Sequence, residues 1–545
     1  MSDALFEVPV PVNEPVLSYG PGTAERAGLQ RELAELGRAE PARLDATIGG
    51  EQLSGDGATF DVVAPHEHAH VLGHARMASG DQARDAVQAA RAAAPGWREM
   101  AFADRAAVFL RAAALLSGPW RDRMNAATML GQSKSVQQAE VDAACELADF
   151  WRFNAAYARD ILTEQPVANA PGVWNRLDHR PLEGFVYAIT PFNFTAIAGN
   201  LPTAPALMGN TVLWKPSPTQ QLAASVTMRL LEAAGLPPGV VNMLPGDGIE
   251  VSEAVLSDPD LAGIHFTGST ATFTRLWRAV ADNLQSYRSY PRIVGETGGK
   301  DFLLAHPSAD PDALVAALVL GAFEYSGQKC SATSRAYLPR SLFNRVREQL
   351  VASTAGLQVG DVADFATFTG AVIDARAYAK LDAALSRAES TDSIKILTGG
   401  GRDDSVGWFV DPTILTCTDP GDEVFTTEYF GPVLAIHVFE DGDFQSVARG
   451  IEAQSRYALT GSVMARDRAA LAWASQALRF CAGNFYLNDK STGAVVGQQP
   501  FGGGRRSGTN DKAGSAQNLL RWTSTRSIKE NFVPPTSTSY PHQQS

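Results

Sequence analysis

Short apolar runs alternate with helical patterns through the middle of the chain. Five runs have the length and composition of buried strands: residues 184–190, 211–215, 240–244, 262–266 and 292–296. Helical patterns lie between them, and the alternation predicts βαβ units in a parallel, doubly wound α/β sheet. Ligands bind at the carboxyl ends of the strands in such sheets, so we expect functional residues directly after these runs.

Helical periodicity dominates the chain before the first of these runs. Apolar positions recur at spacings of three and four in residues 23–39, 81–97 and 103–118. The same spacing predicts one long amphipathic helix at residues 136–162. This part of the chain therefore contributes helices rather than a sheet.

A second region of alternating strands and helices follows residue 300 and runs to about residue 485. Residues 163–181 have the composition of an extended, irregular segment. Residues 521–535 alternate as in a strand, although no partner lies nearby in the sequence. We expect this late segment to pair with another part of the chain or with another subunit.

Length and composition agree with a globular protein of several domains. The chain has 545 residues, of which 45% are hydrophobic and 19% are charged. Lys and Arg number 46 against 59 Asp and Glu, which gives a formal charge of −13 without basic blocks. This balance argues against nucleic acid or an anionic membrane as the main partner. The amino terminus lacks the pattern of a secretory or transit peptide, and no apolar run approaches the ~18 residues of a membrane span, so we expect a cytoplasmic protein.

Two sequence features raise the question of a reactive site. The histidines of residues 66–74 follow the alternation of an exposed strand, so no metal site is predicted there. Cys330, in "GQKCSATSR", has no second cysteine close in sequence, which is typical either of a buried core residue or of a thiolate nucleophile. The four cysteines are spread widely, as is usual in a reducing compartment.

Eight short motifs decide between these alternatives. In chain order they are "TPFNF" (190–194), "GNTVLWKPS" (209–217), "LPGDG" (244–248), "FTGST" (266–270), "GETGGK" (295–300), "GQKCSA" (327–332), "EYFGPV" (428–433) and "PFGGGRRSG" (500–508). Together they resemble the aldehyde dehydrogenase superfamily over nearly the whole chain. Phe192, Thr297 and the serine after Cys330, with "SGTNDKAGS" near the end, are similar to the branch that oxidises L-glutamate γ-semialdehyde to glutamate in proline breakdown.

The resemblance implies the aldehyde dehydrogenase fold and a division of the chain. A Rossmann-like NAD-binding domain is expected from residues 1–165 and 184–298, and an α/β catalytic domain from residues 299–490. Residues 166–183 and 491–545 are expected to form a small β flap for oligomerisation and a carboxyl-terminal tail. A homodimer, formed when the flap reaches across a twofold axis, is the implied assembly.

Aldehyde oxidation needs a thiolate, an oxyanion donor and a base that activates water. The resemblance assigns the thiolate to Cys330, which adds to the aldehyde and later carries a thioester. Asn193 would donate its side-chain amide to the oxyanion, together with the backbone N–H of Cys330. Glu296 would take the proton from the water that hydrolyses the thioester.

The resemblance also implies NAD as the cofactor. The residues expected to bind it are Lys215, Ser217, Gly246, Phe266, Gly268, Ser269, Glu428 and Phe430. Lys215 and Ser217 would reach the adenosine ribose, and Ser269 would cap a helix that faces the pyrophosphate. Many NAD-preferring members carry a glutamate where this chain has Pro218, so discrimination against the 2′-phosphate of NADP stays open.

The substrate carries an α-carboxylate and an α-ammonium at the end far from its aldehyde. Ser331 is expected to donate its hydroxyl to that carboxylate, and a second loop with Gly514 and Ser515 would add backbone N–H groups. Phe194 and Trp522 are expected to lie on either side of the aliphatic chain. Glu146, on the long helix, is expected to face the site and to control access or order water.

Three other functions remain open from the sequence. One is a different ω-semialdehyde dehydrogenase, such as one for succinate semialdehyde. Another is a cofactor-free hydrolase in which Cys330 acts with a histidine such as His265. The third is a non-catalytic binding protein on the same scaffold.

Overall fold

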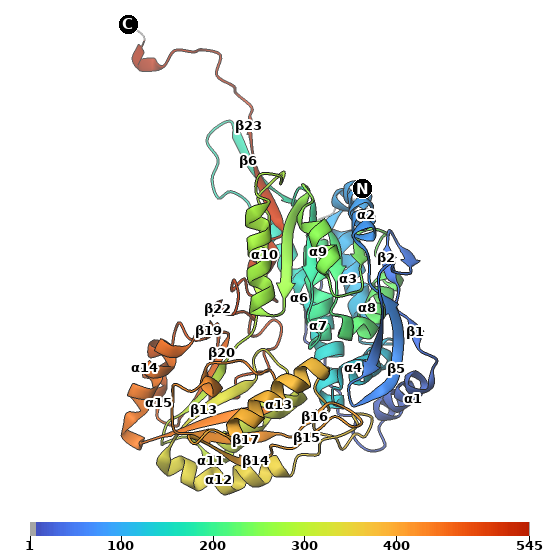
Figure 1. Ribbon diagram of the computed structural model, residues 1–545. Coiled ribbons are helices and arrows are strands. Elements are labelled where there is room, and N and C mark those ends of the chain that lie inside the picture. Colours follow the sequence, from blue (N-terminus) through green and yellow to red (C-terminus); the bar gives the residue numbers. More distant parts are fainter. Residues whose placement is uncertain (1–6, 544–545) are drawn as a thin grey trace.

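Two seven-stranded sheets form the centres of two lobes (Figure 1). The computed structural model describes residues 7–543. The first sheet has the order β11-β10-β7-β8-β9-β2-β3. Its strands are β2 (Ala46–Ile48), β3 (Glu51–Leu53), β7 (Phe185–Ile189), β8 (Thr211–Lys215), β9 (Val241–Met243), β10 (Leu261–Thr267) and β11 (Arg292–Glu296). Strands β7 to β11 are parallel, so each of the five predicted runs is a strand of one parallel sheet.

Helices cover both faces of this sheet, because successive side chains of its buried strands point to opposite faces. Phe185 and Tyr187 pack on one side, and Val186 and Ala188 pack on the other. The helices on the first side are α2 (Gly80–Glu99), α9 (Ile249–Leu256) and α10 (Thr270–Asp282). On the second side lie α7 (Thr195–Leu207) and α8 (Gln221–Ala233), with α3 (Phe102–Leu116) and α4 (Arg121–Gln132) packed on α8. The doubly wound arrangement is confirmed.

The second sheet has the order β14-β17-β18-β13-β12-β20-β21. Its strands are β12 (Asp301–Ala305), β13 (Thr333–Pro339), β14 (Ile394–Thr398), β17 (Thr413–Cys417), β18 (Val433–Phe439), β20 (Thr460–Met464) and β21 (Asn484–Leu487). All neighbours are parallel except β14, which pairs antiparallel with β17. Strand β11 of the first sheet ends at Glu296 and β12 begins at Asp301, so the chain passes between the sheets within a few residues.

The predicted long helix is continuous but not uniform. It consists of α5 (Val136–Ala139), a π-helical segment η1 (Glu140–Glu146) and α6 (Leu147–Thr163). The predicted long helix is present, but seven of its residues form a π-helix. A π-helical turn requires i→i+5 bonding, which the 3.6-residue apolar spacing does not reveal, and such turns are frequent at functional sites.

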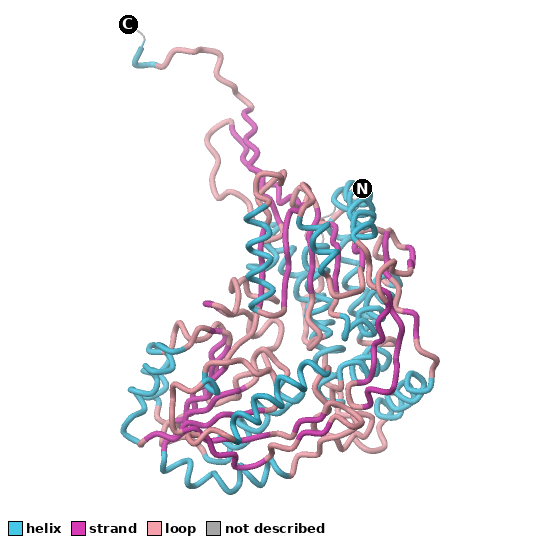
Figure 2. Tube along the Cα trace, in the orientation of Figure 1, coloured by secondary structure: helices cyan, strands magenta, loops and turns pink. Residues whose placement is uncertain are grey.

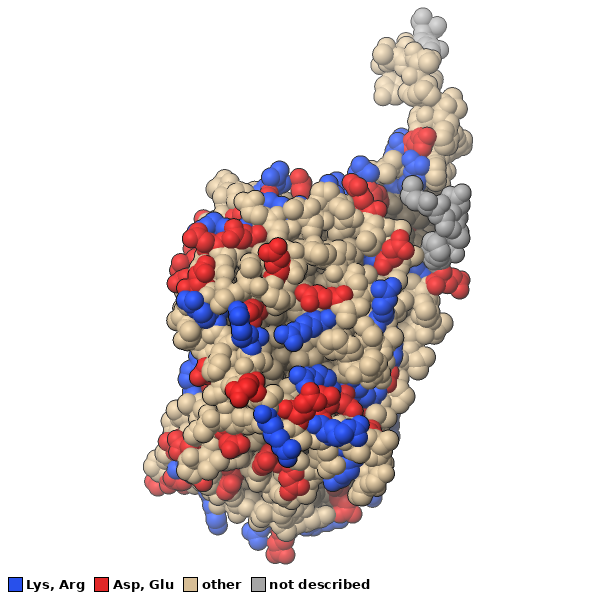
Figure 3. All heavy atoms as spheres, turned by 90° about the vertical axis from the view of Figure 1, so that its right-hand side faces the viewer, with Lys and Arg blue, Asp and Glu red and all other residues tan. Residues whose placement is uncertain are grey.

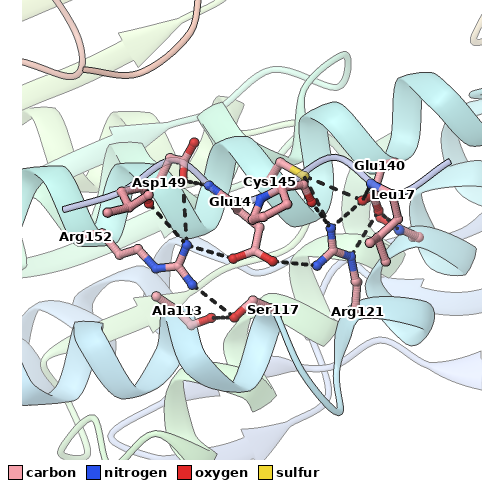
Figure 4. A network of polar contacts seen from close by, with 12 residues as sticks. Glu14, Leu17, Ala113, Ser117, Arg121, Glu140, Cys145, Asp149 and Arg152 are labelled. Carbon is pink, nitrogen blue, oxygen red and sulfur yellow. Dashed lines mark hydrogen bonds and ion pairs between the residues drawn. The ribbon is translucent and has the colours of Figure 1, made fainter. Parts of the chain in front are cut away.

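An amino-terminal segment, residues 13–19, lies along this helix through a network of polar contacts (Figure 4). Arg121, on α4, contacts Glu14 at 2.7 Å and also pairs with the buried Glu140 of η1. Glu140 accepts hydrogen bonds from the Leu17 backbone and the Tyr19 hydroxyl, each at 2.8 Å. The segment is therefore tied to the start of the π-helical segment through Glu140 and Arg121.

A two-stranded ribbon stands away from the two lobes (Figures 1 and 2). Strands β6 (Val173–Pro181) and β23 (Thr523–Asn531) pair antiparallel over nine residues, so the late alternating segment has its partner within the same chain. Residues 491–513 were expected to belong to this flap, but several of them line a cavity between the lobes, described below. The other domain boundaries stay predictions.

Charged side chains of both signs are interspersed on the face drawn in Figure 3. The histidine-containing segment is mostly strand β5 (Glu67–Arg76), in which His68, His70 and His74 are partly or fully exposed, as the alternation predicts. His66 precedes the strand and is buried, so the prediction was wrong for that residue. Within residues 7–543, no helix has the length and apolar character needed to cross a membrane.

Candidate active site

Cys330 lies in a loop that is held by several buried hydrogen bonds. The loop follows two residues with left-handed backbones, Tyr325 (φ 52°) and Ser326 (φ 50°). The Ser326 backbone N–H donates to the Thr369 hydroxyl at 2.6 Å, and the Gln328 side chain accepts from a backbone N–H at 2.9 Å. Backbone strain of this kind persists where the surroundings enforce it, and it is common at active sites.

Asn193 reaches this loop from the other lobe. It follows strand β7, and its side-chain amide donates to the backbone carbonyl of Gln328 at 3.0 Å. The amide has a second N–H, and the side chain is buried. Gln328 precedes Cys330 by two residues, so this contact is compatible with the predicted role of Asn193 as an oxyanion donor.

A cavity of about 90 Å³ opens beside Cys330. The side chains that line it include Cys330, Ser331, Glu296, Glu146 and Phe194, all predicted site residues. A cavity needs roughly 10–15 Å³ to hold one water molecule, so this cavity has room for a small organic substrate. The sequence therefore identified residues from four separate segments of the chain that line one cavity.

Two carboxylates of this cavity, Glu296 and Glu146, are in an environment that favours their neutral forms. Burial, more than any neighbouring charge, raises the pKa of Glu296 to about 8 and the pKa of Glu146 to about 8. Glu296 Oε1 is buried without a hydrogen-bond partner among the described residues. Burial, with the negative charge of Glu296, also raises the pKa of the Cys330 thiol. The thiol therefore needs a base, and two carboxylates with pKa values near neutrality lie in the same cavity.

A smaller hollow of about 10 Å³ also borders Cys330. Its lining includes Lys300, Glu428 and Phe430. Glu428 is partly buried and accepts a hydrogen bond from the Gly299 backbone at 2.9 Å. Phe430 has a left-handed backbone (φ 61°) and packs edge-on against Phe192. Glu428 and Phe430, both predicted to bind the cofactor, thus line one hollow with Cys330.

Lys215 ends strand β8 and is fully enclosed. Its ammonium donates to the backbone carbonyls of Pro216 at 3.1 Å and Gly246 at 3.2 Å, which leaves a third N–H. Burial lowers the pKa of Lys215 to about 8, against the opposing charge of Asp247. Gly248 has φ +86°, and a Cβ there would lie 2.4 Å from the Lys215 side chain, so a glycine is required beside this amine.

The turn between β10 and α10 has the form of an anion-binding helix terminus. Ser269 is the N-cap of α10, and its hydroxyl accepts from the Thr272 backbone at 3.1 Å. Gly268 directly precedes it, and Ser217 begins the short helix after β8. A buried ammonium, a capped helix terminus and the Glu428 carboxylate match the ribose hydroxyls and pyrophosphate of a dinucleotide. These residues fit the predicted cofactor.

Several predicted residues lie away from these cavities. Trp522 is completely buried against His265, with ring centroids 4.7 Å apart, so its predicted place beside the substrate was wrong. The Phe266 side chain stacks on Phe273 inside the core. Gly514 and Ser515 do not line the cavity, and the Ser515 hydroxyl donates to a backbone carbonyl at 2.6 Å instead.

His265 is also unsuited to assist Cys330. Its Nδ1 contacts the Leu201 carbonyl at 2.8 Å, and burial lowers its pKa to about 4. Cys330 and His265 therefore do not form a catalytic pair in this structure.

A cavity wall that the sequence reasoning missed comes from residues 492–501. Thr492, Gly493, Ala494 and Phe501 all line the cavity, and the Thr492 hydroxyl lies 2.7 Å from the Ser331 hydroxyl. This loop follows β21, at the carboxyl edge of the second sheet. The rule that ligands bind at that edge was the signal that could have identified it.

Comparisons with known proteins agree with this geometry. The family model described as "Aldehyde dehydrogenase family" matches residues 53–528. A probable delta-1-pyrroline-5-carboxylate dehydrogenase of Schizosaccharomyces pombe is 47% identical over 542 residues, which cover 99% of each chain. The mitochondrial delta-1-pyrroline-5-carboxylate dehydrogenase of Bos taurus is 48% identical over 98% of this chain and 94% of its own. A crystal structure of the Mycobacterium tuberculosis delta-pyrroline-5-carboxylate dehydrogenase bound with NAD has a TM-score of 0.97 and 58% identity, with 100% of both chains covered. The chain belongs to the aldehyde dehydrogenase family.

Proposed function

We propose that this protein oxidises L-glutamate γ-semialdehyde, the open form of 1-pyrroline-5-carboxylate, to L-glutamate with NAD, as the second step of proline catabolism. The observation that carries the proposal is the cavity in which Cys330 and Ser331 meet two carboxylates with raised pKa values. The relatives named for this reaction match over nearly the full chain. A succinate-semialdehyde dehydrogenase is not favoured by these names, and a binding protein would not need this set of reactive groups.

The reaction begins with proton transfer from Cys330. Because burial disfavours the free thiolate, Glu296 or Glu146 accepts the proton, directly or through a water in the cavity. The sulfur then adds to the aldehyde carbon, and a C–S bond forms while the carbonyl oxygen becomes an oxyanion. The Asn193 amide and the Cys330 backbone N–H donate to that oxygen.

The oxyanion then collapses to a thioester on Cys330. NAD supplies the hydride acceptor for this oxidation when it is bound. Glu296 takes a proton from a water that attacks the thioester, and the C–S bond breaks to release the carboxylate product and the cysteine. Its buried oxygen without a partner is free to make this contact.

We assign the far end of the substrate to the loop of residues 492–494 and to Ser331. These residues bring two hydroxyls and two small residues to one wall, which suits backbone and hydroxyl donors around an α-carboxylate. Phe194 and Phe501 line the same cavity and flank the aliphatic chain, so Phe501 takes the role predicted for Trp522. Glu146 lines the same cavity, and its side-chain oxygens accept hydrogen bonds from the α-ammonium.

A steady-state comparison tests this function. The purified protein should form NADH with glutamate γ-semialdehyde at a higher kcat/KM than with succinate semialdehyde, and Cys330→Ala should abolish turnover. Ser331→Ala should raise KM for glutamate γ-semialdehyde more than for propionaldehyde, which has no carboxylate. A preference for succinate semialdehyde would contradict the substrate, and product formation without NAD would contradict the reaction.

We propose a homodimer formed through the β6–β23 ribbon. Trp174, Phe532 and Val533 are exposed on or beside this ribbon, as apolar residues are at an unfilled interface. Light scattering after gel filtration should give twice the chain mass, and deletion of residues 532–545 should weaken association; a monomer at micromolar concentration would contradict it. The cytoplasmic location stays a prediction, since the bovine relative is named mitochondrial.

A further inference from the structure

Lys134 is a buried cation directly behind the candidate active site. Its side chain is 1% exposed, and its ammonium lies 4.3 Å from the centre of the Phe194 ring. The same ammonium lies 4.6 Å from the centre of the Tyr325 ring. Phe194 lines the substrate cavity, whereas Tyr325 begins the left-handed turn before Cys330. One amine therefore contacts two elements that frame the reaction.

Asp142 ties the same amine to a third element. The Lys134 ammonium donates to Asp142 at 2.6 Å, and Asp142 belongs to the π-helical segment η1. Its two carboxylate oxygens also accept from the Thr195 and Ala196 backbones, each at 2.9 Å. These are the first two residues of α7, so Asp142 holds the start of the helix that directly follows Phe194.

The geometry of η1 places this pair next to Glu146. Asp142 and Glu146 are four residues apart on the π-helical turn, and both line the cavity. The charged groups that act on Glu146 come from three elements: Asp142 and Asp149 from its own helix, Lys134 from the segment after α4, and Lys329 from the Cys330 loop. Glu296 and Cys330 line the same cavity. Lys134 is thus one of two cations in this group.

We propose that Lys134 is a positioning residue, which fixes the Phe194 ring at the substrate and, paired with Asp142, sets the charge of Glu146. The proposal rests on the proposed function, because it concerns the residues that would contact the semialdehyde. A buried cation–aromatic contact restricts the ring to one orientation. The opposite signs of Lys134 and Asp142 give their removal opposite effects on a neighbouring carboxylate.

The decisive experiment compares two substitutions, each of which roughly preserves the volume of the side chain that it replaces. Lys134→Met removes the positive charge, so the ionisation of Glu146 should move to higher pH by about one unit. Asp142→Asn removes a negative charge and keeps an oxygen for the α7 backbone, so the same ionisation should move to lower pH. The readout is the pH dependence of kcat/KM with saturating NAD. Lys134→Met should also raise KM for glutamate γ-semialdehyde about tenfold, because the ring loses its cationic partner.

The Glu146→Gln background identifies the ionising group. In this background neither substitution should shift the remaining pH profile. Shifts of the same sign in both variants, or shifts that persist without Glu146, would overturn the proposal, as would unchanged kinetics in Lys134→Met. If Lys134→Met does not fold, the downward shift in Asp142→Asn and its loss in the Glu146→Gln background decide the question.

The test of Lys134 can be read even if the proposed substrate is wrong. The same profiles are measured with propionaldehyde, which needs neither carboxylate nor ammonium recognition. If wild type oxidises propionaldehyde but prefers succinate semialdehyde, the proposed function fails while the pH shifts still test Lys134. NAD affinity, measured by fluorescence quenching, should be equal in all variants, and a loss of NAD binding would show general damage and overturn the positioning role.

Discussion

Replacing Arg121 by methionine should destabilise the protein far more than replacing a neighbouring arginine. The Arg121 side chain is 7% exposed and lies between Glu14 and Glu140, whose exposures are 11% and 0% (Figure 4). Arg123, two residues further along the chain, has a side chain that is 38% exposed and contacts Glu32 at 3.2 Å. The two arginines therefore form a matched pair that differs chiefly in burial.

The size of the stability loss depends on the Glu140 carboxylate, which stays in the protein when Arg121 is removed. Methionine fills most of the arginine volume, but the Glu140 carboxylate remains fully buried without its cation. Removal of one partner from a buried ion pair costs about 3–5 kcal/mol. A partly exposed pair such as Arg123–Glu32 contributes less than about 1 kcal/mol, so Arg123→Met should stay within that range.

The pH dependence of the unfolding free energy gives a second prediction, which includes the direction of the change. Burial alone would raise the pKa of Glu140, but hydrogen bonds from Arg121 and from the Leu17 backbone lower it below its usual value. In wild type this carboxylate therefore contributes stability above its unfolded pKa of about 4.3, which is lost as pH falls through the folded value. In Arg121→Met burial is opposed only by the remaining hydrogen bonds, which include those from the Leu17 backbone and Asn125, and the folded pKa rises above the unfolded one. The stability gap between variant and wild type should then narrow as pH falls from about 7 toward 4.3.

Urea unfolding at several pH values, followed by circular dichroism, measures both effects. The double variant Arg121→Met with Glu140→Gln should recover part of the lost stability, because the stranded charge is gone. Equal losses for Arg121→Met and Arg123→Met would refute the reasoning. So would a gap that does not change with pH, since the cost would then come from packing rather than from a buried charge.

Three further outcomes are expected. Asn193→Ala should lower kcat by about 10²–10³-fold with little change in NAD affinity, as measured by stopped-flow and binding assays; a change below threefold would exclude an oxyanion contact. Phe501→Ala should raise KM for glutamate γ-semialdehyde, whereas Trp522→Ala should lower the free energy of unfolding by about 3–5 kcal/mol, as for a large core residue. The reverse pattern would show that Trp522, rather than Phe501, contacts the substrate together with Phe194. Pro218→Glu should lower turnover with NADP relative to NAD, and an unchanged ratio would show that another group contacts the 2′-hydroxyl.

The strand positions were predictable because the five runs, each of five to seven residues, are rich in apolar residues. Residues 211–215 and 292–296 were located without error at either end, since lysine and glutamate follow apolar residues where each strand ends. Their parallel arrangement was inferred from the rules of βαβ folds rather than from the runs themselves. The partner of residues 521–535 could not be inferred, because pairing between distant segments leaves no local pattern.

The candidate site was predictable where a residue directly follows a strand. Asn193, Lys215 and Glu296 each lie at a strand end, where the fold class places ligands. Aromatic residues gave no such information, because Phe501 and Trp522 are both compatible with a core or a cavity in sequence. Their separation depends on tertiary packing: Trp522 is enclosed by the core, while Phe501 faces the cavity.

Charges hidden inside the protein mark the limit of sequence reasoning most clearly. Lys134 lies in "GQSKSVQQ", a polar segment that is typical of a solvated helix start, yet the structure buries it between two aromatic rings. A buried ion pair seldom adds net stability over a well-packed apolar pair, because desolvation offsets the attraction. The Lys134–Asp142 pair is therefore hard to explain as a stabilising feature. The pair instead contacts Phe194 and the start of α7 and lies near Glu146 in the substrate cavity. These contacts support a role in positioning the residues of the site.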